Sequence, residues 1–208
     1  NIFLKNFFGK KKITLVDVGA NLGGYTSLIE KNLNINQVHI FEPSKVCFEY
    51  LKKKFNKKNI HINNNALSNV DKIHTFYENE VLSQSSLHNK KNKFNSNLDN
   101  INVYKIRCLN LDKYCANQNK NFVIDILKID AEGEDLNVLK GAKKLLKDKK
   151  VKLIKIELLN SLDKSKNKSN INEIIFFLNK YNYYLSTIAK TKFIDEKLLM
   201  MDVYFSNK

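Results

Sequence analysis

The segment Asp17–Gly24, with the sequence DVGANLGG, has the residue types of a loop that binds a small ligand. It follows a predicted buried strand, Ile13–Val18, and precedes a predicted helix, an arrangement in which ligands bind beyond the carboxyl ends of the strands. Gly19 lets the backbone turn tightly and approach a ligand without a side-chain clash. Gly23 stands at the start of the helix, where free N–H groups favour a carboxylate. Asp17 offers an anionic acceptor for an amino group.

Glu42 is a second candidate binding residue, 25 residues after Asp17 and at the end of the next predicted strand, Val38–Phe41. A carboxylate in this position can accept hydrogen bonds from both hydroxyls of a ribose. Pro43, the only proline in the chain, restricts Glu42 to an extended conformation and so fixes its direction. The two features together indicate a nucleoside-bearing cofactor. Because Asn21 stands where the dinucleotide motif GxGxxG has its second glycine, the pattern favours S-adenosylmethionine over NAD.

Acidic residues also end two later predicted strands, and they indicate acid–base chemistry. Asp130 and Glu132 follow the strand Val123–Ile129, and Glu157 ends the next strand. If these strand ends are neighbours in the sheet, the three carboxylates face one crevice. A positioned base accelerates reaction at a hydroxyl by about 10²–10⁴-fold, and we expect Asp130 to be that base, with Glu132 next and Glu157 orienting. Lys128 lies on the same side of its strand as Asp130, and it either pairs with that acid or binds the substrate.

Short apolar runs alternate with helical patterns along the chain, which is typical of βαβ units around a parallel sheet. The pattern predicts an α/β fold with a seven-stranded, mostly parallel sheet, an antiparallel last strand and helices on both faces. We expect a single domain over residues 1–208, with a cofactor-binding half at about 13–70 and an acceptor-side half at about 101–208. Residues 78–100 are rich in Asn, Lys and Ser and are expected to form a mobile surface excursion.

Two local predictions concern the surroundings of the candidate site. Residues 72–77 and 102–107, which flank the excursion, are expected to pair as extended strands. The apolar residues between Leu136 and Leu146 recur at helical spacing, so one helix is expected there, with acids at its start and lysines at its end.

The composition argues against several other classes of function. The net charge is +15, but Arg107 is the only arginine, and recognition of phosphate by geometry generally uses arginine, so no specific nucleic-acid partner is expected. No apolar stretch is long enough to span a bilayer. The three cysteines form no CxxC pair and the four histidines have no ligand spacing, so no metal is expected and a reducing, cytoplasmic compartment is predicted.

At these residues the chain resembles the FkbM family of methyltransferases. The segment KIDAEGE is the most family-specific part of the resemblance, because many methyltransferases share the glycine loop. The matching segments are DVGANLGGYTSL (Asp17–Leu28), FEPS (Phe41–Ser44), NNNALSN (Asn63–Asn69), LNLDKY (Leu109–Tyr114) and LKIDAEGEDLNVLKGAKKLL (Leu127–Leu146).

The resemblance implies a Rossmann-like class I methyltransferase fold, S-adenosylmethionine as methyl donor, and a hydroxyl of a sugar, lipid or secondary metabolite as acceptor. It implies that Glu42 binds the ribose and that Asn65 and Ala66 lie near the adenine. The residues that it places at the methionine part of the donor are Asp17, Gly19, Asn21 and Gly23, and Ala20 in the same loop is a further expected cofactor-binding residue. Relatives often carry more chain ahead of the first strand, so we expect part of a substrate-covering segment to be absent from this sequence.

Two alternatives remain open from the sequence. Methylation of an RNA ribose hydroxyl would use the same donor and the same kind of base. A domain that binds S-adenosylmethionine without catalysis is the other alternative, although such a domain has no need of Asp130, Glu132 and Glu157.

Overall fold

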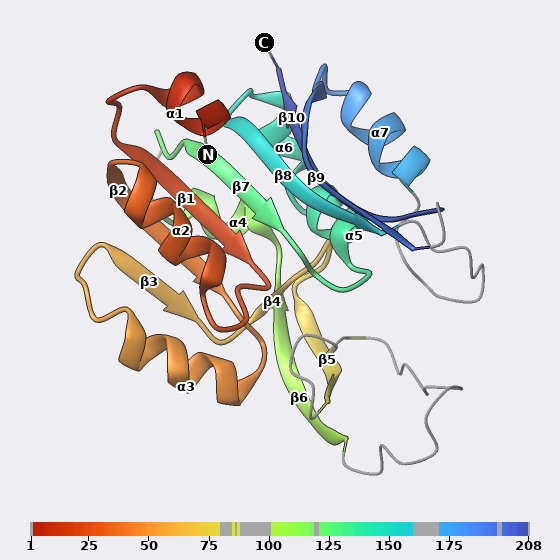
Figure 1. Ribbon diagram of the computed structural model, residues 1–208. Helices are drawn as coiled ribbons and strands as arrows, with labels where there is room; N and C mark the ends of the chain where they lie inside the picture. The colour runs from red at the N-terminus through yellow and green to blue at the C-terminus, as the bar shows by residue number, and fades with distance from the viewer. Residues whose placement is uncertain are drawn as a thin grey trace.

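The computed structural model describes residues 2–79, 85, 87, 101–118, 121–159, 171–194 and 197–207. Within these residues, the central element is a seven-stranded sheet with helices on both faces (Figure 1). Its strands are, in the order in which they lie side by side, β3 (Ile60–Asn63), β2 (Ile35–Phe41), β1 (Ile13–Val18), β7 (Ile124–Ile129), β8 (Val151–Leu159), β10 (Lys197–Ser206) and β9 (Tyr184–Ile194).

The sheet is built outward in two directions from the boundary between β1 and β7. The chain runs from β1 to β2 and β3 on one side, and β7 later pairs with the free side of β1 and is followed by β8. All of these pairs are parallel, whereas β10 is antiparallel to both β8 and β9. The predicted fold is therefore confirmed. In such a sheet the ligand site lies beyond the carboxyl ends of the strands at this boundary.

Helices form a layer on each face of the sheet (Figure 1). The strands between these layers are buried on both sides, which explains why β1 and β7 are buried along their whole length. Leu15 and Ile126 pack under the first layer, and Val16 and Leu127 under the second. The first layer contains α1 (Ile2–Phe8), α2 (Gly24–Asn32) and α3 (Lys45–Lys54), and the second contains α4 (Leu111–Ala116), α5 (Asp135–Lys140), α6 (Lys143–Lys147) and α7 (Ile171–Asn179).

A three-stranded sheet lies beyond the carboxyl ends of the central strands (Figure 1). It consists of β4 (Ala66–Leu67), β6 (Asn102–Leu109) and β5 (Lys72–Glu78), in that order. β5 and β6 are antiparallel over their whole length, so the predicted pairing of 72–77 with 102–107 is confirmed. β4 has only two residues, which is too short for a periodic pattern to reveal it.

The helix after β7 differs from the prediction. The sequence predicts one helix over Leu136–Leu146, but the structure has α5 and α6 with a break at Gly141 and Ala142. A Cβ atom on Gly141 would lie 2.3 Å from the carbonyl oxygen of Ser68, so the backbone after β4 passes directly against this break. Periodicity along one segment does not reveal such a contact with another part of the chain.

Two short helices, α1 and α4, were also not predicted. α4 begins after Asn110, whose side chain accepts a hydrogen bond from the Lys113 N–H and caps the helix. Six or seven residues are fewer than two full turns for each helix, so their apolar positions do not establish a period.

Most of the predicted excursion at 78–100 falls outside the described residues, so its expected mobility stays a prediction. Beyond Asn79, only Ser85 and Leu87 of that segment are described. In the described part of the chain, no helix has the length and hydropathy needed to cross a membrane.

Candidate active site

A pocket opens where the central strands end and the three-stranded sheet begins. Its charged side chains, within the described residues, are all acidic, although the whole chain has a net charge of +15. The pocket is lined by Val18, Gly19, Asn21, Phe41, Glu42, Pro43, Ala66, Leu67, Phe76, Ser85, Leu87, Asp130, Ala131, Glu132, Glu134 and Glu157.

The residues predicted from sequence divide between the pocket wall and the structure behind it. Those on the wall are Gly19, Asn21, Glu42, Ala66, Asp130, Glu132 and Glu157. Those that do not line the pocket are Asp17, Ala20, Gly23, Asn65 and Lys128.

Gly19 lies where the ends of three strands meet. Its N–H donates to the carbonyl of Phe41 at the end of β2, over 2.9 Å. A Cβ atom on Gly19 would lie 1.9 Å from the carbonyl oxygen of Asp130 after β7, and its φ is +67°. Only glycine fits this close approach in this conformation. Gly19 therefore brings the backbone of the loop and the acids after β7 together at the pocket.

Gly23 has a different neighbourhood. A Cβ atom there would lie 2.4 Å from the ring of Phe55 and 2.8 Å from the side chain of Leu51. Gly23 directly precedes the first residue of α2 and has a φ of +71°. Gly23 thus lets the start of α2 pack against α3, and its surroundings are apolar side chains.

We expect Gly19→Ala to destabilise the protein by about 2–3 kcal/mol, because the methyl group meets rigid backbone and the residue has a positive φ. Gly24→Ala is the matched control, since a Cβ atom there meets nothing within 4 Å. Thermal unfolding of both variants measures the difference. Equal stability of the two would show that the strand ends at Gly19 can separate without cost.

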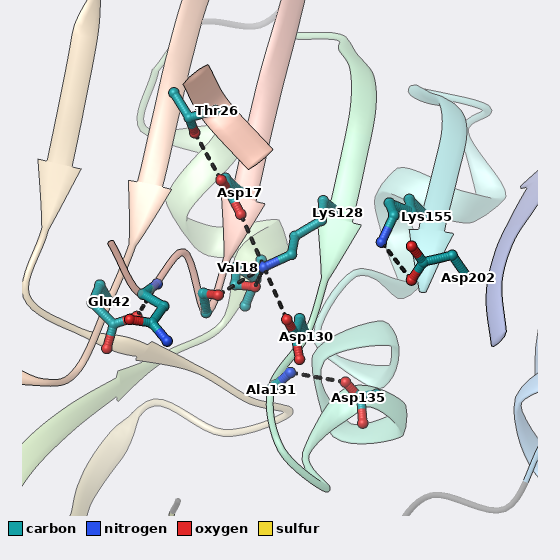
Figure 2. A network of polar contacts seen from close by, with 12 residues as sticks. Asp17, Val18, Thr26, Glu42, Lys128, Asp130, Ala131, Asp135, Lys155 and Asp202 are labelled. Carbon is teal, nitrogen blue, oxygen red and sulfur yellow. Dashed lines mark hydrogen bonds and ion pairs between the residues drawn. The ribbon is translucent and has the colours of Figure 1, made fainter. Parts of the chain in front are cut away.

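Lys128 lies behind the glycine loop, and oxygen atoms of Asp17, Val18 and Asp130 surround its ammonium (Figure 2). Its Nζ is 3.2 Å from a carboxylate oxygen of Asp17 and 3.4 Å from one of Asp130. It also donates to the carbonyl oxygens of Val18 at 3.2 Å and Gly19 at 2.7 Å. Burial lowers the pKa of Lys128, but the two carboxylates raise it more, so the net shift is upward. The ammonium thus holds the loop, β1 and β7 together.

Asp17 belongs to the same buried network. Its side chain is fully buried, and its second oxygen accepts a hydrogen bond from the Thr26 hydroxyl over 2.7 Å (Figure 2). Both carboxylate oxygens therefore contact protein groups, Lys128 on one side and Thr26 on the other. In this arrangement Asp17 joins β1 to α2.

Glu42 presents a buried carboxylate at the pocket wall. One oxygen accepts the Asn21 N–H at 2.7 Å and the other accepts the Ser44 N–H at 2.9 Å. Burial raises the pKa of Glu42 to about 7, although both N–H groups act to lower it. A carboxylate has about four acceptor positions, so each oxygen can accept one further hydrogen bond. Asn21 reaches this carboxylate with a φ of +52°, a conformation that asparagine tolerates better than most residues.

Asn64, which was not predicted as a site residue, fixes the backbone of Glu42 and of the next residue. Its side-chain amide donates to the carbonyl oxygens of Glu42 at 2.9 Å and Pro43 at 3.0 Å. The neighbour Asn65, which was expected to lie near the adenine, donates to the carbonyl of Arg107. In a run of three asparagines, residue type alone does not distinguish them. The useful signal was position, because Asn64 directly follows β3, the neighbour of β2.

Glu157 stands among other acids at the end of β8. Burial raises its pKa, and the charges of Asp130, Asp202 and Glu132 raise it further, while Lys155 lowers it. Lys155 itself is ion-paired with Asp202 at 2.8 Å (Figure 2). Whereas the Asp130 carboxylate is paired with Lys128, the Glu157 carboxylate forms no hydrogen bond or ion pair with a described residue.

Residues 17–185 match the protein family described as the methyltransferase FkbM domain. The chain belongs to this family. No match was found among curated proteins. The FkbM chain also shares the class I methyltransferase fold with many solved structures.

Three solved structures illustrate this similarity of fold. A methyltransferase FkbM from Methylobacillus flagellatus KT has a TM-score of 0.58 and 15% identity, covering 93% of this chain and 43% of that one. An rRNA methylase from Streptococcus thermophilus has a TM-score of 0.55 and 11% identity, with coverages of 99% and 92%. Magnesium protoporphyrin IX methyltransferase from Synechocystis PCC 6803, solved with bound SAM, has a TM-score of 0.53 and 7% identity, with coverages of 100% and 76%. The present chain thus spans less than half the length of the Methylobacillus flagellatus protein.

Proposed function

We propose that this FkbM chain transfers a methyl group from S-adenosylmethionine to a hydroxyl of a small molecule or glycan. The carboxylate of Glu42, held at the wall of an acid-lined pocket at the boundary between β1 and β7, is the observation that carries this proposal. The position is the one where sheets of this kind bind nucleotides and related cofactors.

The pocket fits S-adenosylmethionine in three respects. The free acceptor positions of Glu42 suit the two neighbouring hydroxyls of a ribose. The apolar wall of Phe41, Leu67 and Phe76 suits a purine ring. The acidic lining complements a ligand that carries a sulfonium and an ammonium group. Bound S-adenosylmethionine supplies an electrophilic methyl group.

The chain's own residues then align the acceptor and remove its proton. Holding the nucleophile in line with the methyl group lowers the activation barrier of such a transfer by up to about 7–11 kcal/mol. Asp130 was expected to be the base, but its carboxylate already forms an ion pair with the Lys128 ammonium. Glu157 lines the same pocket and has a raised pKa, which favours taking a proton from the acceptor hydroxyl. We assign the base to Glu157, and an orienting role to Asp130 and Glu132.

Donor affinity should depend on the ionisation of Glu42. Between pH 8 and pH 6, the ionised fraction of a carboxyl with a pKa of about 7 falls about tenfold. Only the ionised form leaves both oxygens free to accept ribose hydroxyls. We therefore expect the Kd of S-adenosylhomocysteine to rise about tenfold over this range. Calorimetric titration of wild type and Glu42→Gln at both pH values is the measurement, and the variant should bind weakly with a flat pH response.

The same ionisation affects the stability of the unliganded protein. The folded pKa lies above the ordinary value of 4.5, so between about pH 4.5 and 7 the folded state binds more protons than the unfolded state. The contribution of Glu42 to stability is therefore lost as the pH rises through this window. A pH dependence of the same size in Glu42→Gln would contradict both expectations.

The acceptor class is tested by mass spectrometry of products formed from S-adenosylmethionine and a library of glycans and small hydroxyl compounds. Methylated hydroxyl products that are missing with Glu157→Gln would support the proposal. Methylation of RNA ribose alone would redirect the acceptor assignment. Donor binding without any product from this library or from RNA would favour a non-catalytic binding domain.

A further inference from the structure

The hydroxyl of Tyr104 reaches from β6 across to the turn that carries Glu42. It accepts a hydrogen bond from the Lys45 N–H at 3.1 Å and lies 3.5 Å from the carbonyl oxygen of Pro43. It donates to a carboxylate oxygen of Glu78 at 2.9 Å. One side chain of the three-stranded sheet thus contacts the backbone of the turn at two points, immediately after the carboxylate assigned to the donor.

This hydroxyl is held firmly in place. Glu78, its acceptor, is buried. The Tyr104 ring contacts Phe76 on the paired strand, with 5.6 Å between ring centroids, and the Lys45 ammonium lies 4.6 Å from the ring centroid. Burial raises the pKa of Tyr104, and the hydrogen bond to Glu78 raises it further. The phenol therefore stays protonated and donates its hydrogen bond to Glu78.

The turn is held on another side by Asn64, which bonds the carbonyl oxygens of Glu42 and Pro43. Ser44 completes the turn, since its N–H donates to Glu42 and its hydroxyl caps α3. Displacement of the backbone at Pro43 or Lys45 would therefore move the Ser44 N–H and change the direction of the Glu42 carboxylate. Tyr104 is the contact from the three-stranded sheet that opposes this displacement.

We propose that Tyr104, supported by Glu78, is a positioning residue that directs the Glu42 carboxylate toward the donor ribose. The inference rests on the proposed function, because it assumes a ribose at Glu42. It gives the three-stranded sheet a role in donor recognition in addition to forming a wall of the pocket. A purely structural Tyr104 would affect stability or overall affinity without singling out the ribose hydroxyls.

The test compares the Kd of S-adenosylhomocysteine with that of its 2′-deoxy analogue. A hydrogen bond to a charged group contributes about 1.5–3 kcal/mol, so wild type should prefer the ribose form by at least about tenfold. In Tyr104→Phe, which keeps the ring but loses the hydroxyl, we expect this preference to shrink to about twofold to threefold. Tyr77→Phe is the matched control, because Tyr77 is half-buried on the opposite face of the paired strand.

Variants of Glu78 keep the test independent of any folding defect in Tyr104→Phe. Glu78→Gln retains an oxygen that accepts the hydrogen bond from the Tyr104 hydroxyl, so it should keep the wild-type preference for the ribose form. Glu78→Leu should lose this preference as Tyr104→Phe does. An unchanged preference in both Tyr104→Phe and Glu78→Leu would overturn the positioning role while leaving the proposed function intact. If folded wild type bound neither nucleoside, the proposed function itself would be refuted, and this inference with it.

Discussion

We expect Glu157→Gln to lower kcat for methyl transfer by about 10²–10⁴-fold while leaving donor affinity nearly unchanged. Glutamine has the size of glutamate but cannot take the proton of an acceptor hydroxyl. The Glu42 carboxylate is held by the N–H groups of Asn21 and Ser44 rather than by Glu157, so the ribose site should not be disturbed. The measurement combines steady-state kcat on an acceptor found by the product screen with calorimetric titration of the donor.

Asp202→Asn provides the pH control for this assignment. The charged groups that face Glu157 are Asp130, Glu132, Asp202 and Lys155. Removing the charge of Asp202 takes away one cause of the raised pKa of Glu157. It also releases Lys155 from its ion pair, and the positive charge of Lys155 lowers the pKa of Glu157. The acid limb of the kcat/KM profile should therefore move to lower pH. If Glu157→Gln keeps full activity and Asp130→Asn loses it, the base is Asp130, as expected from the sequence alone.

The second large effect is expected for Lys128→Met, which should destabilise the fold by about 3–5 kcal/mol. The Lys128 side chain is only 6% exposed, and its ion-pair partner Asp17 is fully buried. Removal of the ammonium leaves a buried carboxylate with its compensating charge gone. Chemical denaturation measures the loss in unfolding free energy, with the dependence of that free energy on denaturant concentration held the same for both proteins.

Two comparisons separate this effect from a general effect of replacing lysine. Asp17→Asn combined with Lys128→Met removes both charges and should recover most of the stability. Lys144→Met, in the exposed ion pair with Asp148, should cost far less than Lys128→Met, because water screens the pair. A cost below about 1 kcal/mol for Lys128→Met would mean that water reaches Asp17, and the buried network would need to be reinterpreted.

The parts of the site that the sequence reveals are those determined by one strand and the turn after it. Glu42 was predicted because Pro43 follows it and a strand precedes it, and the structure places its carboxylate at the pocket wall. The shared face of Lys128 and Asp130 follows from the alternation of side chains along β7. The strand order was implied by the resemblance to class I methyltransferases, because connection rules narrow the possible orders without selecting one.

The parts that the sequence does not reveal depend on contacts between distant segments. Tyr104 is 61 residues from Pro43, and the pairing of β6 within the three-stranded sheet brings them together. Gly23 carries no mark that distinguishes packing against Phe55 from contact with a ligand. The assignment of the base depends on charge–charge distances across β7, β8 and β10, which no local pattern encodes.

Isothermal titration of the folded chain with S-adenosylmethionine at pH 8 directly tests whether Glu42 forms part of a donor site. We expect saturable binding at one site, weakened at least about tenfold in Glu42→Gln, because the variant loses charge-assisted hydrogen bonds to the ribose. Lack of binding by folded wild type would rule out a donor site in this pocket, and equal binding by wild type and Glu42→Gln would rule out the role of Glu42.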